Sequence, residues 1–340
     1  MNIEANDLKH RAVLVLPHIR VQNANAISSP LTWGFPAITA FTGLMIALER
    51  RLSRDAGIAL YGIGVICHHF EAQVTTEGYT RTFRRNPLLP DGSSAAIVEE
   101  GRVHLELTLV FYVQLVDAQR GEVERAALAK RIAHELAGMR VAGGSVIPPL
   151  PGTSQRSIRP ILELVPDLDN TDETQIKNYQ KWWRRLIWRL LPGFALVSRD
   201  DVLKTRLAEL QVNDSKVSEL DAWLDLSRLN INCQKGGSEG IDSLETVEWI
   251  IDKRVGWLVP IPVGFAALSD LHLPGTVNGA RDMKTPFRFV ETVYSVGQWI
   301  SPNRLKNLDD LVWVTDHDPD HPTEYDLYRC CNAYRPLPNR

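Results

Sequence analysis

The order of apolar and amphipathic segments between residues 12 and 140 constrains the fold of this chain more than any other feature. Residues 12–21, AVLVLPHIRV, are typical of a buried strand, and residues 36–52 carry apolar side chains at helical spacing. Residues 58–76 and 103–116 predict two more strands, and residues 122–140 predict a second amphipathic helix. Gly62 and Gly64 favour a bulge in the second strand.

This order of elements predicts an α+β fold. Strand, helix, strand, strand, helix are the first five elements of a ferredoxin-like, RRM-type βαββαβ unit, and residues 190–198 are a candidate closing strand. We therefore expect residues 1–200 to form this core, with a projecting, thumb-like insertion at about 78–100 and an irregular connection at 148–180. Residues 201–340 are expected to form a C-terminal α/β region packed on the core.

Three further segments in the second half of the chain have interpretable patterns. Residues 177–191, KNYQKWWRRLIWRLL, and residues 200–230 are expected to be helical. The segment FRFVETVYSVGQWI, 287–300, is also expected to be a helix.

Charge and cysteine usage exclude several classes of protein. With 38 Lys and Arg against 41 Asp and Glu, the net charge is −3, so a nucleic-acid site has to be a local patch. The four cysteines lack CxxC spacing, which disfavours a zinc site or a disulfide scaffold. No leader or long apolar run is evident, so we expect a cytoplasmic protein without a membrane partner.

The sequence offers no convincing catalytic, metal or cofactor site. It has neither a GxxxxGK[ST] loop nor a GxGxxG motif after a strand. His68 and His69 are adjacent in a strand pattern, where neighbouring side chains point to opposite faces, so they are not expected to share a metal. DHDPDH, 316–321, is more simply a solvated turn than a cation site. We expect a protein that is not an enzyme and holds no metal or cofactor.

A polar segment between the first strand and the first helix, loop 22–35, is a candidate RNA contact. Asn and Ser side chains can read base edges, and aromatic rings can stack on bases. By itself the loop is explained more simply as a turn whose Asn and Ser side chains satisfy its own backbone. The candidate residues are Gln22, Asn23, Asn25, Ser28, Ser29, Trp33 and Phe35.

Two other segments could contact phosphates. Gly143, Gly144 and Ser145 follow the second helix, where glycines allow backbone N–H groups to approach an anion, although a helix end followed by a turn is the simpler reading. The arginines of the projecting insertion could pair with phosphates or be a solvated charge run. The residues of these two segments are Arg81, Arg84, Arg85, Asn86 and Arg140 together with the three named above.

Tryptophans and arginines in helix 177–191 suggest a protein interface. Both residue types are enriched at binding hot spots, although core packing explains the apolar stripe equally well. Exposure of this helix and of residues 257–265 would indicate an obligate heterodimer. The candidate interface residues are Trp182, Trp183, Arg185, Trp188, Arg189 and Trp257.

Several multi-residue motifs occur in one order from about residue 12 to 315. They are QNANAISSPLTWGFPA, FEAQ, RNPL, DGSSAAIVEEGRVHLE, MRVAGGSVIP, RLLPGFALVSR, GWLVPIPVGFAALS and PFRFVE. Together they closely resemble the Csy-two subunits of type I-F CRISPR surveillance complexes, members of the Cas-five family in the RAMP superfamily.

The resemblance implies a non-catalytic RNA-binding subunit that holds the 5′ handle of the CRISPR RNA. Its implied partners are the large type I-F subunit, as a heterodimer, the adjacent backbone subunit, and target DNA through the assembled complex. It implies that loop 22–35 faces the handle and that residues 143–145 and the insertion at 78–100 lie near RNA.

Two other functions remain open at this point. Some Cas-five relatives process guide RNA, and His18, His68 or His104 near Tyr61 or Lys130 would be the catalytic candidates in such an endoribonuclease. A protein-only scaffold would require loop 22–35 to be buried against protein.

Overall fold

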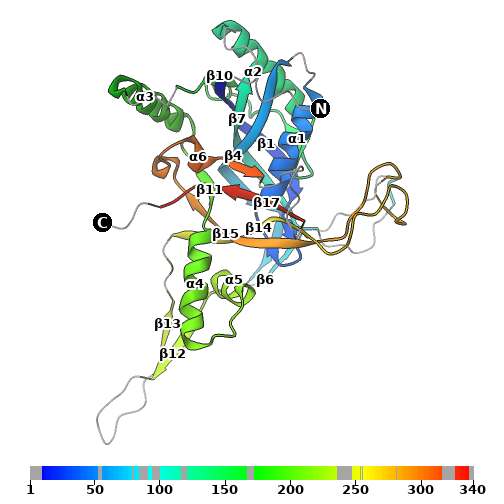
Figure 1. The fold of residues 1–340 in the computed structure, drawn as a ribbon, viewed down its shortest axis with the longest axis vertical. Coiled ribbons are helices and arrows are strands. Elements are labelled where there is room, and N and C mark those ends of the chain that lie inside the picture. Colours follow the sequence, from blue (N-terminus) through cyan, green and yellow to red (C-terminus); the bar gives the residue numbers. More distant parts are fainter. Residues whose placement is uncertain are drawn as a thin grey trace, which may run out of the picture.

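The structure, a computed structural model, is mixed α/β. It describes residues 10–52, 56–78, 80–83, 91–93, 100–115, 121–166, 172–235, 247–252, 254, 256–280, 282–315 and 326–336. These residues contain one antiparallel sheet of 11 strands, three two-stranded sheets and six α-helices (Figure 1).

Long strands from the first half of the chain form the centre of the large sheet. β7 (Arg102–Leu115) lies between β1 (His10–Asn25) and β4 (Ile58–Ala72) and pairs with both in antiparallel register. The other edge of β1 pairs with β9 (Gly144–Ile147) and β10 (Ile161–Leu164), and β8 (Arg140–Val141) pairs with β9.

Two helices cover one face of these strands, as their apolar spacing predicts. α1 (Ile38–Arg51) buries Phe41, Met45 and Leu48, and its last turn carries Arg50 and Arg51, whose charge suits the negative end of the helix dipole. α2 (Glu122–Ala137) buries its own apolar stripe against the same core. Burial of these stripes is the main force that holds both helices on the sheet.

The other face is only partly covered. α3 (Glu173–Arg189) packs its buried tryptophans against Val13 and Val110, which point away from α1 and α2. Further along β7 the side chains on this face become polar, beginning with Thr108 and continuing to Glu106 and His104. The polar half of the face is where a cavity opens.

The closing strand was predicted correctly as a strand, but its predicted place in the sheet is wrong. β11 (Phe194–Ser198) forms, but it pairs with β15 (Val290–Ile300) and β4 rather than with β1. The edge of β1 is already occupied by β9 and β10, which precede β11 in the chain. The expected irregular connection at 148–180 therefore contains a strand, β10, and the start of α3.

Six strands close into a ring of pairings. β14 (Trp257–Ala267) pairs with β15 and with β17 (Leu327–Asn332), and β16 (Trp313–Thr315) joins β17 to β4. Since β11 joins β4 to β15, the ring runs β4, β16, β17, β14, β15, β11. Trp313 is fully buried in it and donates its indole N–H to the Leu196 carbonyl at 2.9 Å. Strands from both sides of residue 200 thus share one sheet.

Two helix predictions in the second half need correction. Residues 290–300 form β15 because Val290, Thr292, Val293, Val296 and Ile300 are β-branched and the strand is paired on both edges, a context that outweighs helical spacing. The single helix expected at 200–230 is two helices, α4 (Asp200–Asn213) and α5 (Glu219–Ser227), because Ser218 caps the second one in a reciprocal capping box with Asp221. α6 (Leu308–Leu311) and a 3-10 turn (Pro302–Arg304) follow β15.

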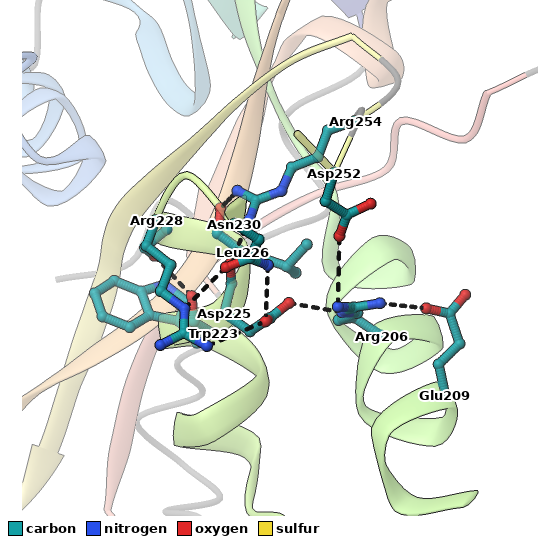
Figure 2. Close-up of polar contacts among 10 residues, drawn as sticks. Arg206, Glu209, Trp223, Asp225, Leu226, Arg228, Asn230, Asp252 and Arg254 are labelled. Carbon is teal, nitrogen blue, oxygen red and sulfur yellow. Dashed lines mark hydrogen bonds and ion pairs between the residues drawn. The ribbon is translucent and has the colours of Figure 1, made fainter. Parts of the chain in front are cut away.

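A two-stranded arm extends away from α4 and α5. It consists of β12 (Ile231–Lys235) and β13 (Val247–Ile251) and projects beyond the large sheet (Figure 1). Asp225 holds its base, accepting hydrogen bonds from Arg206 at 2.7 Å and Asn230 at 2.9 Å, while Arg254 donates to the carbonyls of Asp225 and Leu226 (Figure 2).

Two small pairs of strands complete the description. β2 (Ile27–Ser29) pairs with β3 (Thr32–Trp33) inside loop 22–35, and β5 (Val74–Glu77) pairs with β6 (Thr80–Phe83) at the start of the projecting insertion. None of the helices in the described part of the chain has the length and apolar character needed to span a membrane.

Candidate nucleic-acid interface

Loop 22–35 begins at the end of β1 with two exposed polar residues. Gln22 and Asn23 both lie on the surface, and Asn23 has a positive φ of 57°, a conformation that Asn tolerates better than most residues. The Asn23 backbone N–H donates to His104 Nδ1 at 3.1 Å, which fixes the loop to β7. The two side chains project from a backbone that is held in place.

The next polar residues of the loop build a turn. The Asn25 side chain donates to the Ile27 carbonyl at 2.7 Å and accepts from the Ile27 N–H at 3.1 Å. Ser28 and Ser29 both hydrogen-bond the Thr32 hydroxyl, and Ser29 is buried. These side chains support the turn, so of the predicted polar residues Gln22 and Asn23 are the ones free to face a ligand.

The glycine turn is a tight β-hairpin between β8 and β9. Ala142 and Gly143 have φ values of 48° and 78°, the pattern of a two-residue turn with both central residues left-handed. Gly144 lies against β1, where an added Cβ would come within 2.7 Å of the Ala24 backbone N. Arg140, at the base of the turn, donates to the Gly143 carbonyl at 3.0 Å.

The glycine turn and loop 22–35 meet at one edge of the sheet. Gln22 pairs directly with Ser145 in the β1–β9 register, and the Asn25 N–H donates to the Ala142 carbonyl at 2.9 Å. Exposed Gln22, Asn23, Arg140 and Ser145 therefore share one surface, although about 120 residues separate the two segments in the chain.

A polar cavity of about 560 Å³ lies beside this surface, over the uncovered half of the sheet. Arg20 and Gln22 line it from β1, His104 and Glu106 from β7, and His68 from β4; the other lining residues are His18, Val21, His69, Glu71, Leu105, Ile147, Leu150 and Pro192. It contains all three histidines of the endoribonuclease reading, but neither Tyr61 nor Lys130 lines it.

Two bulges bring the cavity's histidines together. The registers of β1 and β4 against β7 both shift near Leu107, between Leu16 and Ile19 on one side and between Cys67 and His69 on the other. The strict alternation expected for His68 and His69 is therefore wrong, since His68 is the extra residue of a bulge, and both side chains line the same cavities. The predicted bulge near Gly62 is confirmed.

The hydrogen bonds of His68 define its protonation. Its Nδ1 lies 2.5 Å from the Pro192 carbonyl, which only accepts, so Nδ1 carries the proton. Its Nε2 then accepts from the Thr108 hydroxyl at 2.7 Å. Burial lowers the pKa of His68, opposed by the Pro192 hydrogen bond, and the neighbouring His18 lowers it further. His68 is thus a neutral imidazole with both nitrogens occupied.

His18 comes from β1, the strand on the other edge of β7. Its Nδ1 donates to the Glu106 carboxylate at 2.6 Å, and its backbone N–H donates to the Thr108 hydroxyl at 3.2 Å. The Thr108 hydroxyl thus accepts from the His18 backbone and donates to His68, which links β1 and β4 across β7. Within the described residues, no group of three or more His, Cys, Asp or Glu side chains is placed to hold a metal ion.

An aromatic cavity of about 380 Å³ lies on the other side of His68 and His69, which line both cavities. Trp33 and Phe35 enter it from loop 22–35, and Phe194 and Trp257 enter it from β11 and β14. The remaining lining residues are Ser28, Gly34, Cys67, Phe70, Leu196, Val259, Pro260, Ile261 and Trp299. Burial raises the pKa of the Cys67 thiol to about 12, so the thiol that lines this cavity stays uncharged.

Sequence reasoning missed most of this cavity. Phe70, Phe194 and Trp299 come from three separate strands, and only the pairings of the closed ring bring them together. The pairing of β4 with β11, which no local pattern encodes, places Phe194 next to Cys67.

The expected exposure of the tryptophans in helix α3 needs correction. Trp182 and Trp183 are buried among the residues that hold α3 on the sheet, because their positions follow the apolar stripe of the helix. Trp188 is 71% exposed, and Arg185 and Arg189 are exposed next to it, each 3.2 Å from Glu163. Of the interface residues predicted on this helix, Arg185, Trp188 and Arg189 are therefore the ones open to a partner.

Within the projecting insertion, the structure describes residues 78, 80–83, 91–93 and 100. Arg81 is exposed on β6, and Arg84, Arg85 and Asn86 lie outside the described residues, as does segment 316–321.

Comparison with known proteins gives one family. The sequence model described as "CRISPR-associated protein (Cas_Csy2)" matches residues 14–330. A protein of Pseudomonas aeruginosa (strain UCBPP-PA14) named "CRISPR-associated protein Csy2" is 46% identical over 316 residues, which cover 91% of this chain and 93% of that protein.

Proposed function

Because this chain belongs to the Csy2 family of CRISPR-associated proteins, we propose that it is a non-catalytic RNA-binding subunit of a type I-F surveillance complex. In this proposal it holds the 5′ handle of the CRISPR RNA in the prokaryotic cytoplasm, and it pairs with the large subunit and the adjacent backbone subunit. It reaches target DNA only through the assembled complex.

The convergence of loop 22–35 with the glycine turn carries the proposal. Gln22 and Ser145 are direct register partners, and Asn23 and Arg140 are exposed beside them. Amide and hydroxyl groups can hydrogen-bond base edges of single-stranded RNA, while an arginine can position a phosphate. Arg20 and His104 extend the same surface into the polar cavity. A local patch of this kind agrees with a net charge of −3.

We also propose that β1, α1, β4, β7, α2 and β10 form a ferredoxin-like, RAMP-type core. The strand order β4, β7, β1, β10, with all neighbours antiparallel, supports this assignment, since it is the order of a split βαβ unit. The closing strand in this proposal is β10, assisted by β9, instead of residues 190–198.

The partner surfaces proposed here are the outer face of α3 and the projecting insertion. Trp188, Arg185 and Arg189 are exposed on α3, and Arg81 is exposed on β6. An exposed tryptophan flanked by arginines has the composition of a binding hot spot.

A side-chain deletion that spares the backbone tests the RNA contact. Gln22→Ala with Asn23→Gly removes both amides, and glycine tolerates the left-handed backbone at position 23. We expect the double variant to bind CRISPR RNA more weakly than wild type in filter binding, while Asn303→Ala, an exposed amide that lines neither cavity, binds normally. Unchanged affinity in the double variant would reject this surface.

A handle-processing endoribonuclease is the second candidate, because His18, His68 and His104 line one cavity. The occupied nitrogens of His68 and the absence of Tyr61 and Lys130 from the lining favour the non-catalytic role. Incubation of the purified chain with precursor CRISPR RNA decides between them. We expect intact RNA, and cleavage that His68→Gln abolishes would instead establish the nuclease.

A further inference from the structure

We propose that the aromatic cavity receives the base of one unpaired RNA nucleotide, whose sugar and phosphate cross His68 and His69 toward the polar cavity. This inference rests on the proposed RNA-binding function and names the subsite that one nucleotide would occupy.

The walls of the cavity are suited to a flat ring. Phe35 contacts Trp299 with ring centroids 4.8 Å apart, Trp299 contacts Trp257 at 6.3 Å, and Trp257 contacts Phe194 at 5.6 Å. These contacts fix the rings relative to one another along one wall, and Trp33 and Phe70 enter the cavity from other strands. Aromatic faces held in this way can stack on any base.

The rim of the cavity remains exposed in the isolated chain. Trp33, Phe70, Phe194 and Trp257 are between 41% and 57% exposed, although each is large and aromatic. Aromatic side chains that surround a hollow of about 380 Å³ without being covered mark a binding site rather than a packed core.

The polar cavity next to the aromatic cavity favours a nucleotide over an apolar protein side chain as the ligand. His68 and His69 line both cavities, so the two cavities adjoin at these two residues. Beyond them lie Arg20, Gln22 and His104, which can bind phosphate and ribose oxygens. A ligand with a flat aromatic part and a polar, anionic part fits both cavities at once. An aliphatic or aromatic protein side chain would use only one of them.

Continuity with loop 22–35 favours RNA over a free nucleotide. The same loop supplies Gln22 to the polar cavity and Trp33 and Phe35 to the aromatic one. An RNA strand whose neighbouring nucleotides contact Gln22 and Asn23 would therefore place its next base at the rim of the aromatic cavity.

Abasic substitution tests the subsite on the full-length chain. The probe is a single-stranded RNA with the sequence of the 5′ end of the guide RNA that co-purifies with the protein, synthesised with one abasic nucleotide at each position in turn. We expect one position to weaken binding about 5- to 150-fold, the range for loss of one stacked base. Trp257→Ala should weaken binding of the intact RNA to a similar extent. In this variant, the abasic nucleotide at that position should have no further effect on affinity. Trp249→Ala, an exposed tryptophan on β13 that lines neither cavity, should leave both affinities unchanged.

The possible failures have different signatures. Normal RNA binding with an abasic effect that persists in Trp257→Ala rejects the subsite and leaves the proposed function intact. Absence of RNA binding by the wild-type chain and by its complex rejects the proposed function. Binding of nucleoside monophosphates that depends on Trp257, without RNA binding, assigns the cavity to a free nucleotide and overturns the inference. Loss of a partner subunit in Trp257→Ala, with RNA binding unchanged, assigns it to a protein side chain and also overturns it.

Discussion

The imidazole rings of His18 and His68 stack with centroids 4.4 Å apart, above Thr108 of the strand that separates their own strands. Each histidine lies in a bulge of its own strand, and the two bulges face the same part of β7 from its two edges. A regular register in either strand would place its histidine elsewhere. Both rings line the polar cavity, and His68 also lines the aromatic one.

The buried, neutral His68 predicts a loss of stability in mild acid. Its pKa is lowered from the ordinary value of 6.5, chiefly by burial, so the unfolded chain takes up a proton at a higher pH than the folded protein. The contribution of His68 to stability is therefore complete above about pH 6.5 and is lost as the pH falls below it. We expect the Tm of wild type to fall between about pH 8 and pH 5.5 by more than that of His68→Gln. His134→Gln, an exposed histidine on α2, should retain the wild-type dependence, and an equal slope in all three proteins would contradict the prediction.

Two glycines predict opposite effects of the same substitution. Gly144→Ala places a Cβ 2.7 Å from the backbone of Ala24, so we expect a loss of about 1–3 kcal/mol in the free energy of unfolding. Gly43 lies in α1 with open space around it, and Gly43→Ala should gain about 0.5–1 kcal/mol because alanine favours the helix. Urea denaturation of both variants measures the contrast. If Gly144→Ala were neutral, the close approach of β9 to β1 would be refuted.

The bulges show why sequence reasoning located the strands and helices of the first half of the fold but not the arrangement of the histidines. Apolar periodicity is local, so it correctly predicted β1, α1, β4, β7 and α2. A bulge depends on the partner strand, and a one-residue shift reverses which face each following side chain occupies. The alternation assumed for His68 and His69 failed for this reason.

Asp225 predicts a local effect at the base of the arm. Burial raises the pKa of this carboxyl, but hydrogen bonds from Arg206 and Asn230 outweigh burial and hold the pKa below its ordinary value. Asp225→Asn removes the charge that these partners bind, so we expect trypsin or chymotrypsin to cleave β12–β13 faster while the Tm changes little. Glu219→Gln on the same helix α5, an exposed residue, is the matched control. Equal cleavage in Asp225→Asn and wild type would show that the network in Figure 2 does not hold the arm.

Asn332 predicts a large loss of global stability. Its amide donates to the carbonyls of Asp310 and Val312 and accepts from the N–H groups of Ser198 and Tyr334, all in a buried position. Asn332→Leu leaves these backbone groups without partners, and we expect a loss of roughly 2–4 kcal/mol in urea denaturation. Asn303→Leu makes the same exchange on the surface and should stay within about 0.5 kcal/mol of wild type. Similar losses in both variants would contradict the role given to Asn332.

The candidate surface was predictable in part. Loop 22–35 and the glycine turn stand out by composition, but their contact depends on the pairing of Gln22 with Ser145, which is a long-range register. The aromatic cavity was not predictable, since its residues come from β3, β4, β11, β14 and β15. Long-range pairing with β11 and β14 likewise explains why residues 290–300 are a strand despite their helical spacing.

The ring of six strands also sets an order of events during synthesis. β16 and β17 are the segments that join β4 to β14, and they follow every other strand of the sheet in the chain. A nascent chain that has already emerged as far as β15 still lacks this link, so part of the edge of β4 stays open to wrong partners while the ribosome completes the rest. Strands β16 and β17 emerge after the other strands of the sheet and are thus the ones that close the ring, so unwanted pairing with other chains is a hazard before they appear.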